Sequence, residues 1–171
     1  MSYLNVEIKA RAPELNFARE YLLSHGAEFK GTDEQTDTYF NVPNGRLKLR
    51  EGNIENNLIF YERPDQPGPK NSSFSLVKVE DAAGLKKALA GSIGLKVIVI
   101  KKREIYYIKN VKFHLDTIEN LGSFIEIEAG NILADLSQQQ LLVQCEFYMK
   151  ELKIIPGDLI DISYSDMLLG K

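Results

Sequence analysis

Three carboxylates are spaced so that they can converge on one point of a predicted β-hairpin. Residues 113–128 alternate apolar and polar types on either side of the turn sequence Asn120-Leu-Gly122, which predicts strand, tight turn and strand. Side chains two apart on a strand share a face, so Glu126 and Glu128 point the same way, and Asp116 joins them across the turn. Carboxylates about 4 Å apart repel by roughly 4 kcal/mol per pair at an effective dielectric near 20, which favours a bound cation. Oxygen ligands favour Mg²⁺ or Mn²⁺ over zinc, and a hairpin whose polar face is merely solvated is the alternative.

Other predicted strands carry cations on one face. If these faces point outward, they are solvated and the core lies elsewhere. If they point inward, a closed sheet encloses a ring of cations beside the acidic cluster, and that cavity suits a ligand with several phosphates and a divalent metal. The pattern alone leaves both arrangements open. The residues are Lys9 with Glu7 on the first strand, Arg46, Lys48 and Arg50 on the third, Arg63 on the fourth, and Lys101 and Arg103 on the strand that begins at Leu95.

About eight strands and three helices must position these side chains. The strands follow one another mostly in hairpin order, so we expect an antiparallel sheet, and eight strands can close into a barrel with room for one small ligand. The predicted strands are 3–11, 35–40, 46–50, 58–63, 74–80, 95–107 and the two arms of the 113–128 hairpin. The predicted helices begin at Pro13, after an Asp81 cap and after a Ser137 cap, and residues 64–72 and 158–171 are predicted to be a loop and a tail. The expected fold is an α+β closed antiparallel barrel with helices outside.

Composition excludes several classes of protein. The 171 residues, of which 44% are hydrophobic and 26% charged, predict one soluble domain over residues 1–171. A net charge of −3 argues against general nucleic-acid binding, and Cys145, the single cysteine, allows no intrachain disulfide. The sequence has neither a signal-peptide core nor an apolar run long enough to cross a bilayer, so we expect a cytoplasmic protein with no membrane partner.

The order and spacing of several short motifs resemble the CYTH superfamily, the class IV adenylate cyclases and thiamine triphosphatases, also called triphosphate tunnel metalloenzymes. The resemblance covers nearly the whole chain and is nearest to the class IV cyclase group. The family is named for an N-terminal Glu-x-Glu-x-Lys, and this chain has Asn5 at the first of those positions. The motifs are Asn5-Val-Glu-Ile-Lys9, Gln35-Thr-Asp-Thr-Tyr-Phe40, Leu47-Lys-Leu-Arg50, Tyr61-Glu-Arg63, Lys101-Lys-Arg103, His114-Leu-Asp116 and Glu126-Ile-Glu128.

The resemblance implies an eight-stranded tunnel that binds a triphosphate. Carried onto this chain, it implies that Glu7, Lys9, Arg103 and Glu126 are catalytic. It implies phosphate binding by Lys9, Lys48, Arg50, Lys101 and by Arg63 and Arg103, and binding of Mg²⁺ or Mn²⁺ by Glu7, Asp116, Glu126 and Glu128. The missing carboxylate at Asn5 leaves the number of metals open. We interpret His114 as a hydrogen-bonded structural histidine, and Tyr39 and Tyr61 as wall residues.

Two classes of function fit these residues. The first is an enzyme, either a cyclase in which the ribose 3′-hydroxyl of ATP attacks the α-phosphate and pyrophosphate leaves, or a triphosphatase in which water attacks the terminal phosphate of thiamine triphosphate, inorganic triphosphate or a nucleoside triphosphate. The second is a protein that binds a nucleotide or polyphosphate without turning it over. We expect the cyclase-like enzyme, with ATP or a related triphosphate as its partner. The oligomeric state is open, and a homodimer is one alternative.

Overall fold

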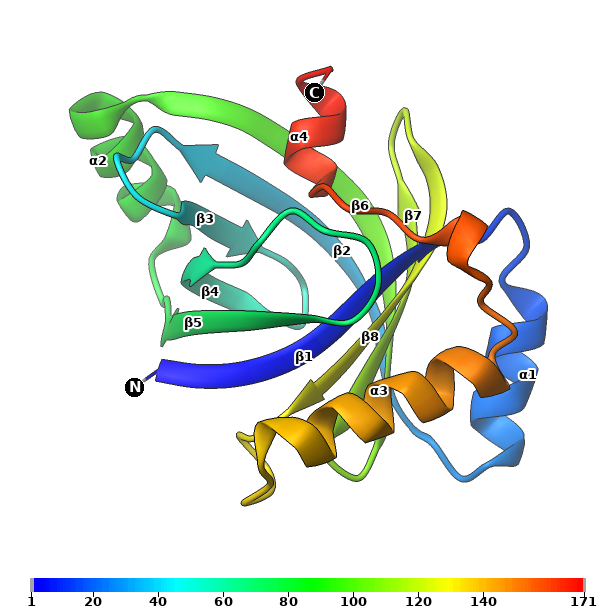
Figure 1. Cartoon of the computed structure of the whole chain (residues 1–171). Helices are drawn as coiled ribbons and strands as arrows, with labels where there is room; N and C mark the ends of the chain where they lie inside the picture. The colour runs from blue at the N-terminus through cyan, green and yellow to red at the C-terminus, as the bar shows by residue number, and fades with distance from the viewer. Residues whose placement is uncertain (1, 171) are drawn as a thin grey trace.

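Eight antiparallel strands close into a barrel in the computed structural model, which describes residues 2–170 (Figure 1). Within these residues the pairing order is β1-β5-β4-β3-β2-β6-β7-β8, and β8 returns to pair with β1. The predicted closed eight-stranded barrel is confirmed. The strands are β1 (Ser2–Arg11), β2 (Glu28–Phe40), β3 (Arg46–Glu51), β4 (Asn56–Glu62), β5 (Lys70–Lys78), β6 (Leu95–Ile108), β7 (Val111–Ile118) and β8 (Gly122–Gly130).

Helices pack on the outside of the barrel. The apolar alternate residues of β1, Val6, Ile8 and Ala10, are almost fully buried in a core that also contains Leu22 of α1 and Leu141 of α3. The opposite face of the same strand therefore points inward, because successive strand side chains alternate. The helices are α1 (Asn16–Ser24), α2 (Ala82–Ile93), α3 (Gln138–Glu151) and α4 (Tyr164–Leu168), with a short 3₁₀ turn, η1 (Pro156–Asp158).

Local sequence signals set several element boundaries. Asp81 accepts a hydrogen bond from the backbone N–H of Gly84 at the start of α2, and Ser137 forms a capping box with Gln140 at the start of α3. Both predicted caps are confirmed. The first helix begins at Asn16 rather than at Pro13.

The prediction was wrong about two segments. Residues 64–72 were expected to form only a loop, but β5 begins at Lys70, where the chain pairs with β1 in the register Glu7 to Lys70 and so closes the barrel. This pairing overrides the low strand propensity of Asn71 and the serines beside it. The C-terminal tail contains α4, which makes the number of α-helices in residues 2–170 four rather than three.

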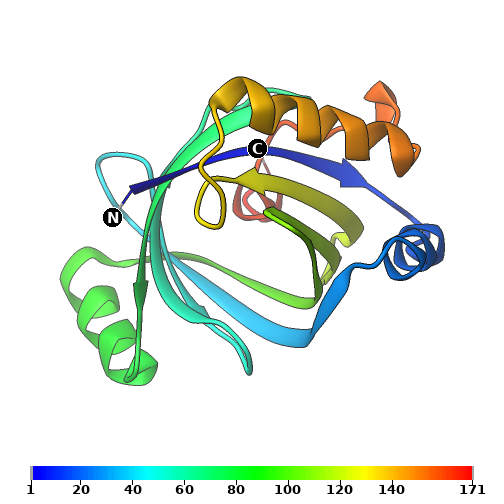
Figure 2. The same ribbon diagram turned by 90° about the horizontal axis from the view of Figure 1, so that it is seen from below.

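Helix α4 lies at one end of the barrel (Figure 1), and from the other end it is visible behind the ring of strands (Figure 2). Tyr164, the first residue of α4, is buried in a second apolar cluster with Phe124 of β8 and Tyr39 of β2. The interior is thus covered at that end by the C-terminal segment. None of the described helices is long and apolar enough to cross a membrane.

Candidate active site

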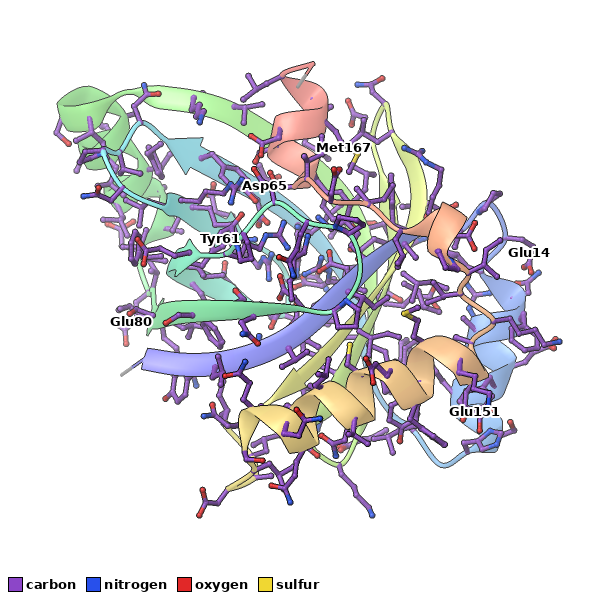
Figure 3. All side chains as sticks on the ribbon, viewed as in Figure 1. Glu14, Tyr61, Asp65, Glu80, Glu151 and Met167 are labelled. Carbon is purple, nitrogen blue, oxygen red and sulfur yellow. The ribbon has the colours of Figure 1, made fainter. Side chains whose placement is uncertain are left out.

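The barrel encloses a cavity of about 270 Å³ whose wall is dense with charge. The charged faces therefore point inward, and the interior arrangement of the two left open by the sequence is the observed one. Figure 3 shows Tyr61 among the nitrogen-rich and oxygen-rich side chains inside the barrel, whereas Glu80 and Glu151 lie at the periphery. Nine of the ten predicted site residues line the cavity: Glu7, Lys9, Lys48, Arg50, Arg63, Lys101, Arg103, Glu126 and Glu128. Asp116 does not.

A buried carboxylate that the sequence analysis missed holds three of the cations together. Asp37 of β2 accepts two hydrogen bonds from Arg50, at 2.9 and 2.8 Å, and its Oδ2 lies 2.6 Å from Lys101 Nζ and 3.3 Å from Lys48 Nζ. Burial raises the pKa of Asp37, but the three cations outweigh it and hold that pKa well below the usual range. Asp37 was within a quoted motif, and its place in the β2 alternation with Tyr39 was the signal that it points inward.

Asp116 lies behind the cavity wall and holds Arg103. Its two oxygens accept hydrogen bonds from Arg103 at 2.7 Å each, and one of them also accepts the hydroxyl of Tyr164 at 2.9 Å. Both oxygens of Asp116 therefore accept hydrogen bonds, and its metal role stays a prediction. Its geometry makes it a positioning residue that fixes the guanidinium of Arg103. Tyr164 was not predicted, because its place depends on the C-terminal segment crossing the barrel end.

Two arginines form ion pairs with carboxylates that were predicted to bind metal. Arg63 Nη1 donates to Glu7 Oε1 at 2.6 Å, and Arg103 Nη2 donates to Glu126 Oε1 at 3.0 Å. Burial raises the pKa of Glu126, but Arg103 and Lys9 outweigh it and hold the pKa well below its usual range, so this carboxylate is ionised. Arg63 and Arg103 therefore each neutralise one carboxylate inside the barrel.

The acidic cluster has the composition of a divalent-cation site. One ligand atom from each of Glu126, Glu128 and His114 lies within 4.8 Å of the others. Within residues 2–170, Glu128 has no lysine or arginine nitrogen within 4 Å. Burial and the nearby Glu7 raise the pKa of Glu128 to about 7. A bound cation would relieve the repulsion between these two carboxylates. These residues fit a divalent metal.

The interpretation of His114 as a hydrogen-bonded histidine was wrong. The side chain is buried, and neither ring nitrogen has a hydrogen-bond partner in the described part of the chain. Its Nδ1 lies 3.9 Å from Glu126 and 3.7 Å from Glu128, which is beyond hydrogen-bond length.

Among the lysines and arginines that line the cavity, Lys9 is the one with no carboxylate oxygen within 4 Å in residues 2–170. Its ammonium lies 3.7 Å from the centre of the Tyr164 ring. Burial, opposed by Glu126, lowers the pKa of Lys9 to about 7. Lys9 is therefore able to exchange a proton near neutral pH.

One wall of the cavity is apolar. Residues Ile59 and Tyr61 of β4 lie opposite Leu76 and Phe74 of β5 in register, and all four line the cavity. The Tyr61 and Tyr39 hydroxyls are 3.3 Å apart, as expected for wall residues. This wall is suited to a flat or apolar group rather than to phosphate.

Glu55 and Lys112 form a further ion pair in the cavity wall, beside β7. Glu55, in the loop between β3 and β4, accepts a hydrogen bond from Lys112 at 2.8 Å and lies 3.4 Å from Arg50. Asp33 fixes this loop by accepting the backbone N–H groups of Ile54 and Glu55. The sequence analysis missed Glu55, since a loop residue carries no strand alternation to indicate its direction. It also missed Lys112, although Lys112 shares a face of β7 with His114.

Comparison with known proteins shows the family. The CYTH domain family model matches residues 4–140. The chain belongs to the CYTH domain family. It is 27% identical over 182 residues to a protein of Methanocaldococcus jannaschii named "Putative adenylate cyclase MJ0240", covering 96% of this chain and 98% of that protein.

Solved structures share the CYTH barrel. The PH1012 protein from Pyrococcus horikoshii OT3 superposes with a TM-score of 0.81 at 23% identity, covering 95% of this chain and 98% of that one. HpAC1 from Hippeastrum, described as having a dominant triphosphatase activity, superposes with a TM-score of 0.61 at 14% identity, covering 98% and 94%. CYTH membership supports an enzyme that acts on a triphosphate.

Proposed function

We propose that this chain is a divalent-metal-dependent enzyme that acts on an organic triphosphate, and that its reaction is the conversion of ATP to cyclic AMP and pyrophosphate. The observation that carries the proposal is that a cation ring, an acidic cluster and an apolar wall line one cavity. A cation ring alone suits any polyphosphate. The apolar wall adds a place for the organic group at the other end of the substrate.

Arginines and lysines bind the phosphates. Arg63 and Arg103 offer planar forks that match phosphate oxygens, while Lys48 and Lys101 add point charges. Asp116 and Asp37 fix Arg103 and Lys101 in position before the ligand arrives. Such preorganised positive charge lowers the barrier to phosphoryl chemistry because it need not reorganise as negative charge develops.

The carboxylates hold the metal. Glu7, Glu126 and Glu128 supply oxygen ligands on one side of the cavity. When bound, a divalent cation neutralises phosphate charge and polarises phosphoryl oxygens. Glu126 accepts Arg103 through Oε1, so its Oε2 is the oxygen free for this role.

Lys9 is the group we assign to proton movement. With a pKa of about 7, its neutral form can accept the proton that the attacking hydroxyl or water loses, and its protonated form can pass that proton to the leaving phosphate group. Arg50 and Arg103 have firm carboxylate partners and serve as fixed charges.

Hydrolysis of the triphosphate is the second candidate. HpAC1, which shares the fold, is described as having a dominant triphosphatase activity, whereas the M. jannaschii relative carries a cyclase name. The two reactions use the same phosphate grip and differ in the nucleophile. The apolar wall favours the cyclase, because cyclisation requires a bound ribose and base while hydrolysis of the terminal phosphate does not.

The test compares three compounds with purified protein and Mn²⁺. A cyclase forms cyclic AMP and pyrophosphate from ATP, leaves 3′-deoxy-ATP intact because its nucleophile is missing, and releases no orthophosphate from tripolyphosphate. A triphosphatase releases orthophosphate from all three. Tight binding of ATP without any product would show a binding protein and overturn both reactions.

The apolar wall provides a sharper comparison. Leu76→Ala is expected to raise the KM for ATP roughly 5- to 30-fold, equivalent to about 1–2 kcal/mol of lost apolar contact. Its effect on inhibition by tripolyphosphate should be negligible, since that compound has no organic group. Val77→Ala is the matched control, because Val77 is on the outer face of the same strand and 58% exposed. Equal effects of Leu76→Ala on ATP and tripolyphosphate would contradict the assignment of this wall.

A further inference from the structure

His114 is a buried polar side chain that the proposed mechanism does not use. The residue is 1% exposed, and neither Nδ1 nor Nε2 has a hydrogen-bond partner within residues 2–170. A buried polar group without a partner costs about 1–3 kcal/mol, so a structural histidine in this place should have found one. The unused nitrogens indicate that something else completes the site.

Backbone register fixes the direction of the His114 ring. In the β7–β8 pair His114 lies directly opposite Glu126, and Glu128 is two residues further along β8 on the same face. The Nδ1 atom lies 3.9 Å from Glu126 Oε2 and 3.7 Å from Glu128 Oε1. The imidazole therefore faces the two free carboxylate oxygens of the acidic cluster.

These distances are close to those of ligands that share one ion. The three candidate ligand atoms lie within 4.8 Å of one another. Two ligand atoms on a divalent ion, each bonded at about 2.1 Å, are roughly 3–3.5 Å apart, so small side-chain rotations bring all three into contact with it. Arg103 occupies only Oε1 of Glu126 and does not block the approach.

We infer that His114 is a nitrogen ligand of the metal that Glu126 and Glu128 bind, and that the site therefore prefers a transition-metal ion such as Mn²⁺ or Co²⁺ over Mg²⁺. Imidazole nitrogen suits first-row transition metals, whereas Mg²⁺ is held almost wholly by oxygen. The inference rests on the metal site of the proposed function and adds a ligand and a metal preference to it.

The experiment detects the nitrogen directly rather than through activity. Electron spin-echo envelope modulation of the Mn²⁺-loaded protein reports nitrogen coordinated to the ion. Tripolyphosphate contains no nitrogen, so it can be added to complete the site. The sequence has two histidines, and His25 is exposed at the C-terminal end of α1 and does not line the cavity, so His25→Gln is the matched control. Imidazole coupling in His25→Gln identifies His114 as its source, and this result does not depend on a His114 variant that folds.

A second variant measures the contribution of the ligand. His114→Gln is expected to lose the nitrogen coupling and to bind Mn²⁺ or Co²⁺ at least about tenfold more weakly, while its affinity for Mg²⁺ changes much less. The inference is overturned if wild type binds Mn²⁺ without imidazole coupling, if the coupling persists in His114→Gln, or if no Mn²⁺ binds. Absence of imidazole coupling together with formation of cyclic AMP would reject His114 as a ligand and leave the proposed function intact. Imidazole coupling without turnover of any triphosphate would support His114 as a metal ligand and reject the proposed function.

Discussion

Asp37→Asn should be among the most destabilising isosteric substitutions in the cavity wall. The Asp37 side chain is fully buried and is the shared partner of Arg50, Lys101 and Lys48. The asparagine keeps the shape but removes the charge, so three buried cations lose their principal counter-ion. Removal of one partner from a buried ion pair costs about 3–5 kcal/mol. For a chain of 171 residues, at about 2–4 °C per kcal/mol, the expected fall in Tm is on the order of 10 °C.

Urea and thermal unfolding measure this loss, and Asp65→Asn is the matched control. Asp65 also accepts a hydrogen bond from an arginine, Arg46 at 3.0 Å, but its side chain is 49% exposed. An exposed pair contributes about 0–1 kcal/mol, and Arg46 keeps its second partner, Asp166. If the two substitutions lower the free energy of unfolding equally, Asp37 is not the neutralising centre of the cation ring and the reasoning fails.

Ligand and pH dependence give independent checks of the same substitution. Tripolyphosphate should raise the Tm of Asp37→Asn more than that of wild type, since the unpaired cations gain a counter-ion on binding. Because the cations lower the folded-state pKa of Asp37, its stabilisation is present above the unfolded value near 3.8 and is lost as the pH falls through the lower folded value. The stability difference between wild type and Asp37→Asn should therefore be constant near neutral pH and narrow below about pH 4.

Two further predictions concern the affinity for tripolyphosphate, measured by calorimetry without added metal. Lys48→Ala should weaken binding by about 1.5–3 kcal/mol, the value of a charge-assisted contact, whereas Lys102→Ala, on the outer face of β6, should change nothing measurable. Affinity should also fall as the pH rises through about 7, because Lys9 loses a positive charge and Glu128 gains a negative one. Binding near pH 7.5 should take up protons; equal affinity at pH 6 and pH 9 would contradict both pKa shifts.

Strand alternation predicted which charges share a face of the sheet, because it depends only on backbone geometry. Glu126 and Glu128 share a face at any degree of twist, and the same holds for Lys101 and Arg103. That the charged faces point inward could be seen only from the closed sheet, in which the apolar side chains of β1 pack against α1 and α3 on the outside. Alternation could not show this, since it is equally compatible with either face being buried.

Contacts between residues far apart in the sequence could not be predicted from it. Asp37 contacts Lys101 from a strand 64 residues away, and Tyr164 contacts Asp116 from the C-terminal segment. Such contacts depend on strand order and on how the chain end crosses the barrel. Helix α4 has five residues, too few for a helical repeat of apolar residues to be recognised.

The ion pairs of the interior imply that triphosphate and metal bind cooperatively. Seven cations line the cavity with four carboxylates, and Asp37 and Asp116 lie directly behind, so the site has a net charge of about +1 if all are ionised. A triphosphate of roughly four negative charges therefore cannot be neutralised by the site alone. We expect Arg63 to turn from Glu7 to phosphate oxygens when the triphosphate binds, which releases a buried carboxylate that needs a new cation. A divalent metal supplies that charge next to the phosphates, so each ligand raises the affinity for the other by the same factor.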